Sequence, residues 1–308
     1  MNEELLFERA KAHKDRDFLQ IATAFNETVR IYVAKTTKIV NDAQAVHKMY
    51  PTSLAALGRT LTATVIMGGM LKQDQSIAVK IEGDGPIGKI VCEADSTGRV
   101  MGYLHNPEVF LQYKNGKLNV GDAVGHNGTL SVVKDLHLKE PFTSSVPIIN
   151  GEIAEDFAYY FALSEQVPSS VSLGVLVGVN GEALAAGGFI IQAMPDCKEE
   201  TITYLENRLK DIAPISTMIK EEKTGREILK EILGDNEFQV LKNAPIHFGC
   251  SCTKERFRKG IMSLGKKTVS DLLEKDHGLT ATCQYCGKAY SFTEDELKEM
   301  LKEMGDAC

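Results

Sequence analysis

The sequence has no apolar segment long enough to cross a membrane. Its most apolar run, residues 61–71, lies between Arg59 and Lys72, whereas a transmembrane helix needs about 20 apolar residues. Residues 1–18 carry several acidic side chains and lack the apolar stretch of a secretory signal. We therefore expect a cytoplasmic protein that does not span a membrane, in which residues 61–71 belong to a buried helix.

The sequence also lacks an excess of positive charge and the motifs of common enzymes. Its formal net charge is −7, which argues against general nucleic-acid binding, because that needs a cationic surface. It contains no HExxH, GxSxG, P-loop or kinase motif. Residues 83–88, GDGPIG, match G-x-G-x-x-G, but a strand is expected to follow them, which favours a hairpin turn. Because residues 1–195 show no catalytic constellation, we do not expect an enzyme.

Residues 1–195 are predicted to form an α+β core domain of β-sheet packed with helices. Two helices are expected between residues 17 and 72, the second following Pro51, because apolar residues recur at helical spacing. The first is predicted from an apolar face formed by Phe18, Ile21, Ala22, Phe25 and Val29. Residues 76–135 alternate apolar and polar residues between recurrent turn signals, which predicts an antiparallel sheet.

A helix and a hairpin are expected to complete this core domain. Residues 152–170 have the pattern of a helix that ends before Pro168. Two buried strands should follow, joined at Asn180-Gly181, a dipeptide typical of tight hairpin turns.

The rest of the chain is predicted to form a helical linker and a small C-terminal zinc-binding domain. Residues 196–240 are charged and amphipathic, which predicts two short helices with a break at Pro214. One of them has an apolar stripe formed by Ile202, Leu205, Leu209 and Ile212. Residues 241–308 should form the C-terminal domain, whose last helix begins at the capping box TEDE, residues 293–296.

Four of the seven cysteines form two short motifs in this C-terminal segment. Cys250 and Cys252 form C-x-C, and Cys283 and Cys286 form C-x-x-C. In a cytosolic chain such clusters are more often metal ligands or redox centres than structural disulfides. Four thiolates suit tetrahedral zinc, and a segment under 70 residues long has little apolar core without such a cross-link. We therefore predict one zinc ion per chain, bound by these four cysteines in the reduced form.

The spacing of the cysteines leaves the role of the zinc open. The plainer interpretation is a purely structural ion, which the spacing alone favours. The alternative is a redox switch, because zinc holds the sulfurs as thiolates, the form that oxidants attack. Oxidation to disulfides would remove the ligands and the folding free energy of about 10–16 kcal/mol that the metal contributes. A zinc-ribbon-like RNA or protein adaptor and a thiol oxidoreductase using residues 283–286 are further alternatives.

Other histidine, basic and cysteine residues are candidates for a role in this site. His247 is not expected to be a ligand, because four cysteines already fill a tetrahedron. The basic residues that follow Cys252 favour a solvated helix face over a thiol-activating or RNA-binding patch; they are Lys254, Arg256, Arg258 and Lys259. Cys92 is predicted to be a small core residue, whereas the pattern assigns no role to Cys197 or Cys308.

The segments FGCSCTKERF and CQYCGKAYSF closely resemble the C-terminal zinc module of the redox-regulated 33-kilodalton heat-shock chaperones. Other distinctive segments follow the family's order, including GRTLTATVIMGGMLK, IEGDGPIGKIVCEADSTGRVMGY, YYFALSEQVPSSVSLGV and AAGGFIIQAMP. The resemblance covers roughly residues 17–300. Residues 1–16 are extra length to which no role is assigned.

This resemblance implies a cytosolic, ATP-independent holdase of the stress response that is inactive while reduced and zinc-bound. Oxidation is implied to form the disulfides Cys250–Cys252 and Cys283–Cys286, to release zinc, and to unfold the C-terminal module together with the linker. The activated protein is implied to form a homodimer and to hold unfolding client proteins, which prevents their aggregation.

Overall fold

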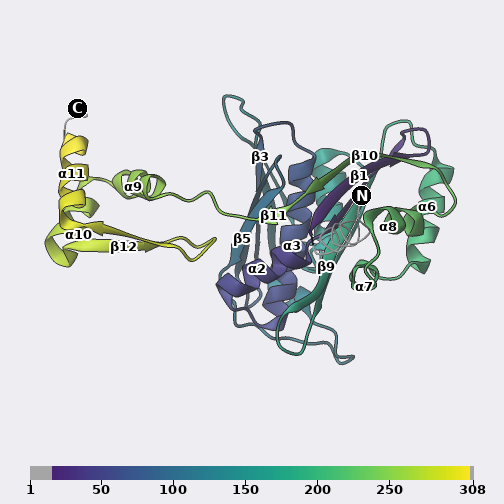
Figure 1. The fold of residues 1–308 in the computed structure, drawn as a ribbon, viewed down its shortest axis with the longest axis horizontal. Helices are drawn as coiled ribbons and strands as arrows, with labels where there is room; N and C mark the ends of the chain where they lie inside the picture. Colours follow the sequence, from purple (N-terminus) through teal and green to yellow (C-terminus); the bar gives the residue numbers. More distant parts are fainter. Residues whose placement is uncertain (1–15, 306–308) are drawn as a thin grey trace, which may run out of the picture. The chain divides into compact units, whose positions relative to one another are not determined.

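The computed structural model describes residues 16–305, which fall into two compact units divided between Phe248 and Gly249 (Figure 1). Both units contain helices and strands, which confirms the predicted α+β class. Residues 1–15 of the predicted N-terminal extension and Cys308 lie outside the described residues. Within the described part of the chain, no helix is both long and apolar enough to cross a membrane.

The first unit contains two β-sheets. The five-stranded sheet has the order β10-β1-β2-β9-β8 and is antiparallel throughout. Its strands are β1 (Phe18–Ala24), β2 (Val29–Lys35), β8 (Ser169–Val177), β9 (Ala183–Ala193) and β10 (Phe238–Pro245). The six-stranded sheet has the order β11-β5-β4-β3-β6-β7 and is antiparallel except for the pair β11 and β5. Its strands are β3 (Ser76–Gly83), β4 (Lys89–Asp95), β5 (Arg99–Leu104), β6 (Gly128–Asp135), β7 (Phe142–Pro147) and β11 (His247–Phe248).

Helix α3 (Pro51–Gly69) lies between the two sheets and contacts strands of both (Figure 1). Sixteen of its residues are buried, so the helix has no solvent-exposed face. Small residues permit this close packing, and the three buried threonine hydroxyls at 60, 62 and 64 each donate to a carbonyl one turn earlier. The prediction of a buried helix after Pro51 is confirmed. Three other helices precede residue 195. They are α2 (Thr37–His47), α4 (Val120–Val124) and α5 (Ala154–Tyr160), and α5 continues into the π-helical turn Phe161–Glu165.

The prediction of a helix around residues 18–29 is wrong, because this segment forms strands β1 and β2. The chain reverses at residues 25–27, whose positive φ angles make the turn between these strands. Leu19 and Ile21 of β1 pack toward α3, while Ala22 and Ala24 pack into the core on the opposite face of the sheet. A strand that is buried on both faces shows no alternation of apolar and polar residues. Its apolar residues therefore fitted a helical spacing by coincidence.

The strands expected in residues 76–135 are confirmed as β3 to β6, and residues 83–88 form the turn between β3 and β4. The hairpin expected at Asn180-Gly181 is confirmed as the connection from β8 to β9, with Gly181 at a φ of 82°. Local turn chemistry is therefore visible in the sequence wherever a short loop joins neighbouring strands.

Three helices, rather than the two expected, follow the core strands. They are α6 (Glu199–Asp211), α7 (Ile215–Lys220) and α8 (Gly225–Leu233), with the expected break at Pro214. The additional break arises at Thr224, which begins α8 through a capping box with Glu227. Apolar residues of all three helices pack on the face of the five-stranded sheet opposite α3.

After α8 the chain returns to the first unit before it enters the second. Strand β10 pairs along the whole of β1, with Phe18 opposite Pro245, and β11 pairs with β5. The structural division therefore falls at residue 248, while the three-part organisation with boundaries at residues 195 and 240 stays a prediction.

The second unit contains three helices and a two-stranded sheet. They are α9 (Lys254–Ser263), α10 (Lys266–Asp276), β12 (Gly278–Thr282), β13 (Ala289–Thr293) and α11 (Glu294–Gly305). Its core has six buried residues, which are Ile261, Val269, Tyr290, Phe292, Leu297 and Met300. The predicted capping box at the start of α11 is confirmed, since Glu296 N donates to Thr293 Oγ1 and Thr293 N donates to Glu296 Oε2.

Candidate metal centre

The four cysteines of the two predicted motifs lie together in the second unit. Their sulfur atoms are all within 4.8 Å of one another. Cys250 Sγ lies 3.7 Å from Cys283 Sγ, and Cys252 Sγ lies 3.4 Å from Cys286 Sγ. None of the four forms a disulfide.

Two tight backbone features bring these thiols to one point. Cys283 and Cys286 lie in the turn between β12 and β13, where Gly287 N donates to Cys283 O over 2.8 Å. Gly287 has a φ of 70°, which glycine adopts without strain. Cys250 and Cys252 lie just before α9, which Thr253 caps by accepting a hydrogen bond from Arg256 N. Each short motif therefore presents two sulfurs from one bend of the chain.

The separations of the sulfur atoms fit a tetrahedral metal site. Zinc–sulfur bonds are about 2.3 Å long, so the ligands of a regular tetrahedron lie about 3.8 Å apart. The two measured separations of 3.4 and 3.7 Å are close to that value. Within residues 16–305 this is the sole group of at least three cysteine, histidine or acidic residues placed to hold an ion. The donor set and its dimensions therefore fit a thiophilic metal ion.

The thiols of this cluster have unequal acidities. Burial raises the pKa of Cys252, but hydrogen bonds from the Tyr290 hydroxyl and neighbouring thiols outweigh burial and bring the pKa to about 7. Burial raises the pKa of Cys250 and of Cys286. The hydrogen bond with Cys252 in turn raises the pKa of Tyr290 to about 12. Cys252 is therefore more readily ionised near neutral pH than Cys250 or Cys286.

Tyr290 is a residue of this site that the sequence analysis did not identify. Its hydroxyl lies 3.3 Å from Cys252 Sγ and donates to Cys252 O over 2.9 Å. Its ring packs on Phe257 at a centroid distance of 5.0 Å. The only sequence signal for Tyr290 was the alternation of residues 289–293, which places Tyr290 on the buried face of a strand, as it would any core residue.

Two of the four basic residues that follow the first motif have acidic partners within the second unit. Lys254 forms an ion pair with Glu296 and lies over the ring of Phe292, and Arg258 pairs with Glu303. Both join α9 to α11. This favours the interpretation as a helix surface over that of an RNA-binding patch.

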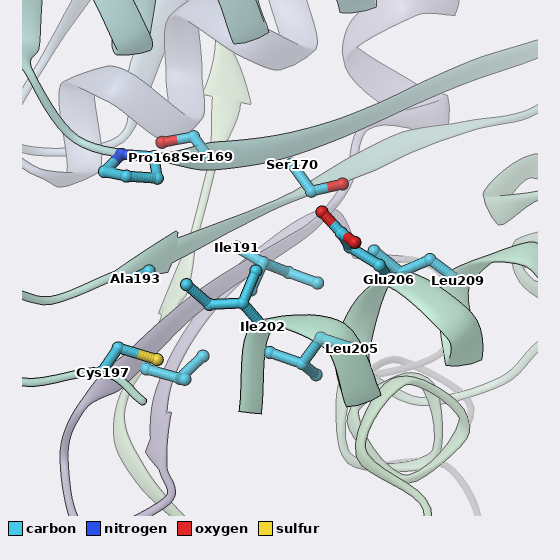
Figure 2. A pocket seen from close by; sticks show the side chains of 11 residues that line it. Pro168, Ser169, Ser170, Ile191, Ala193, Cys197, Ile202, Leu205, Glu206 and Leu209 are labelled. Atoms are coloured by element: carbon cyan, nitrogen blue, oxygen red, sulfur yellow. The ribbon is translucent and has the colours of Figure 1, made fainter. Parts of the chain in front are cut away.

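Three further candidate residues, His247, Cys92 and Cys197, lie in the first unit. His247 belongs to β11, opposite Arg99, and Cys92 is fully buried in β4, as predicted. Cys197 lines a small cavity of about 170 Å³ (Figure 2). The cavity lies between α6 and the part of the five-stranded sheet where β8 begins and β9 ends. Figure 2 shows the Cys197 thiol at one end of this cavity, which the apolar side chains of Ile191, Ile202 and Leu205 also line.

The fold and this cluster define the class of protein: a two-sheet α+β unit followed by a four-cysteine metal-binding module. Residues 17–293 match the family described as Hsp33 protein. The chain belongs to this family. It is 50% identical over 283 residues to a 33 kDa chaperonin of Bacillus subtilis, covering 92% of this chain and 97% of the relative. A 33 kDa chaperonin of Bacillus pumilus is 49% identical, with coverages of 94% and 99%.

A solved structure supports the same assignment. The crystal structure of a 33 kDa chaperonin, a heat shock protein 33 homolog from Thermotoga maritima, superposes with a TM-score of 0.87 at 35% sequence identity. The match covers 94% of this chain and 99% of that one. The protein is therefore a chaperone by class.

Proposed function

We propose that this protein is a cytoplasmic, ATP-independent holdase that is switched on by oxidation. One observation supports the proposal: the four clustered thiols belong to a unit whose apolar core consists of only six buried residues. Such a core is too small to supply more than a few kcal/mol of stability. Bound metal would contribute about 10–16 kcal/mol. The redox state of the sulfurs would thus decide whether the unit is folded.

In the resting state Cys250, Cys252, Cys283 and Cys286 would hold one zinc ion as thiolates. Bound zinc supplies a cross-link that ties the segment before α9 to the turn between β12 and β13. An oxidant such as hydrogen peroxide would take two electrons from each pair of thiolates, form one disulfide, and be reduced to water. Disulfide sulfurs are poor metal ligands, so the ion would be lost and the unit would unfold.

We propose the disulfides Cys250–Cys252 and Cys283–Cys286, as the family resemblance implies. The folded unit also brings Cys250 Sγ to 3.7 Å from Cys283 Sγ and Cys252 Sγ to 3.4 Å from Cys286 Sγ. Proximity does not choose between them, because all ligands of a tetrahedron are neighbours. Peptide mapping by mass spectrometry after oxidation would distinguish the two pairings.

The segment of residues 196–240 would act as the linker that couples unfolding to activity. Its helices cover apolar residues of the five-stranded sheet, and the covering residues include Leu205, Ile215, Met218, Ile228 and Leu229. Release of these helices would expose apolar surface to which unfolding clients bind. The activated chain would form a homodimer through surfaces uncovered in the same step.

Aggregation of a heat-unfolded client, followed by light scattering, tests the proposal. The chain oxidised with hypochlorite, or with peroxide and mild heat, should suppress scattering, whereas the reduced, zinc-loaded chain should not. Zinc quantitation with thiol counting on the same samples should show one metal lost for four thiols consumed. If aggregation proceeds equally with both forms, the protein is not a redox-switched holdase.

A further inference from the structure

Strand β8 has one unpaired edge. It is the last strand of the five-stranded sheet, and among the described residues no strand pairs with its outer side. The opposite side bonds to β9, where Ala193 N donates to Pro168 O. Met194 N instead donates to Thr28 O, in the direction of β2. Odd-numbered residues of β9 therefore bond toward β8 and even-numbered residues bond toward β2, since antiparallel ladders alternate.

This alternation identifies the backbone groups at the free edge. Val171, Leu173 and Val175 lie opposite even-numbered residues of β9, so their N–H and C=O groups point outward. Their side chains pack toward α3 as partly buried members of the core. The outer edge thus offers a row of alternating donors and acceptors, which only another extended chain satisfies fully.

The other long edges of the two sheets carry residues that oppose such pairing. Within their own bounds, strand β10 contains Lys242 and ends at Pro245, and β7 ends at Pro147. Lysine and proline on edge strands are common protections against unwanted strand addition. Strand β8, with the sequence SSVSLGVLV, has neither a charge nor a proline. Of these edges, β8 is the one that lacks protection.

A groove of about 1140 Å³ runs along this edge and is predominantly uncharged. Its exposed apolar side chains include Phe110 and Val179. The four charged residues of its lining balance one another, and Arg59 forms a 2.6 Å ion pair with Glu152. The groove therefore complements an uncharged, apolar segment rather than a charged one.

We propose that the outer edge of β8 takes up an extended, uncharged apolar segment of an unfolding client as an added β-strand. This inference rests on the proposed holdase function and assigns that function a binding site. Residues of α5 and α7 form walls of the groove, at Ala154 and Glu155 and at Ser216 and Thr217. A single extended segment fits between such walls, whereas the same edge of a second copy, recessed between its own walls, would collide with them. Because α7 lies in the linker proposed to unfold, activation removes one wall and widens access.

Binding of a nine-residue peptide of alternating valine and threonine, labelled with fluorescein, tests the inference by fluorescence anisotropy. The peptide should bind the oxidised full chain more tightly than the reduced chain. Methylation of its alternate backbone nitrogens keeps its apolar side chains but removes its strand-pairing donors. This should weaken binding at least about tenfold, as expected from losing two or more hydrogen bonds of about 1 kcal/mol each. Equal binding of both peptides would overturn the inference.

A matched pair of variants tests the same edge from the protein side. Val171→Pro removes an outward N–H, which edge strands tolerate without loss of the inner ladder. Val171→Ala removes a comparable part of the side chain and keeps the N–H. Val171→Pro should bind the peptide about fivefold more weakly than Val171→Ala, the effect of one hydrogen bond. Equal affinities of the two variants would contradict strand addition.

A second pair keeps the test decisive if Val171→Pro does not fold. Ser172→Lys places on β8 the edge lysine found on β10, and Ser172→Thr adds bulk without charge. The lysine variant alone should lose peptide binding. If Ser172→Lys changes the sedimentation coefficient of the oxidised chain and leaves peptide binding unchanged, the edge joins two copies of the chain and the inference is wrong.

If the oxidised wild type suppresses aggregation but binds both peptides equally, the inference fails and the holdase function stands. If the oxidised wild type does not suppress aggregation, the holdase function itself fails.

Discussion

The two units of this protein reach a folded state by different means. The first unit encloses α3 between two sheets and has two large apolar clusters, one on each side of the five-stranded sheet. The second unit has one small cluster and four thiols gathered at one point. Burial of apolar side chains does not depend on redox state, whereas metal ligation by thiolates does. With the metal bound as proposed, one chain would combine a redox-indifferent unit with a redox-dependent one.

Metal removal should produce the largest effect and should separate the two units. A chelator, or Cys283→Ser, removes about 10–16 kcal/mol of folding free energy, which exceeds the whole stability of many domains, about 5–15 kcal/mol. Hydrogen exchange should show residues 249–308 losing protection while β3 and β4 keep theirs. Cys197→Ser, which lies in the first unit, serves as the matched control. If residues 249–308 kept their protection from exchange after metal removal, the second unit would not depend on metal for its folded state.

A cavity in the first unit should have a smaller effect that is confined to that unit. Leu61 is fully buried on α3, so Leu61→Ala should destabilise the first unit by about 2–5 kcal/mol. Urea denaturation followed by far-UV circular dichroism measures the loss. Zinc affinity of the variant should equal that of wild type. A variant that loses zinc along with stability would show that the two units fold as one.

Titration of Asp17 should make the stability of the first unit depend on pH. Asp17 as a residue is 4% exposed, and its carboxylate accepts hydrogen bonds from Lys38 N and Ile39 N at the start of α2. Burial dominates and raises the pKa of Asp17 from 3.8 to about 6. The folded state then binds more protons than the unfolded state between these values, so stability falls as pH rises from about 4 to about 6.

Asp17→Asn should remove this dependence. The difference in unfolding free energy between wild type and Asp17→Asn should change by on the order of 2 kcal/mol between pH 4 and pH 6. Chemical denaturation at both values measures it. A difference that is constant across this range would show that Asp17 titrates as it does in the unfolded chain.

Matched caps in the two units give the smallest expected effects. Thr224 begins α8 and Thr293 begins α11 through the same pair of hydrogen bonds with a glutamate three residues later. Thr224→Ala and Thr293→Ala should each cost about 1 kcal/mol. The rate of backbone amide hydrogen exchange should rise about fivefold. The increase should fall in residues 225–233 for Thr224→Ala and in residues 294–305 for Thr293→Ala. If either variant raised the exchange rate in both units, the two units would not be stabilised independently.

Local features of the structure were visible in the sequence. The spacing of Cys250, Cys252, Cys283 and Cys286 predicted the cluster of thiols, because each motif needs only one bend to present two sulfurs. The hairpin at Asn180-Gly181, the break at Pro214 and the cap at Thr293 depend on nearby residues in the same way. The hairpin, the break and the cap each involve a few neighbouring backbone groups, so a local pattern indicates them, whereas the meeting of the two cysteine motifs joins residues 33 and 34 positions apart.

Other features were decided by tertiary structure alone. Strands β1 and β2 were mistaken for a helix because both faces are buried, and double burial removes the alternation that marks a strand. Strand β10 joins β1, with Phe18 opposite Pro245, and no local pattern records a partner so far along the chain. Tyr290 reaches Cys252 only because β13 and the first cysteine motif meet in space. Sequence therefore determined where the chain turns and which thiols gather, while contacts between distant segments determined which strands pair and what surrounds the sulfurs.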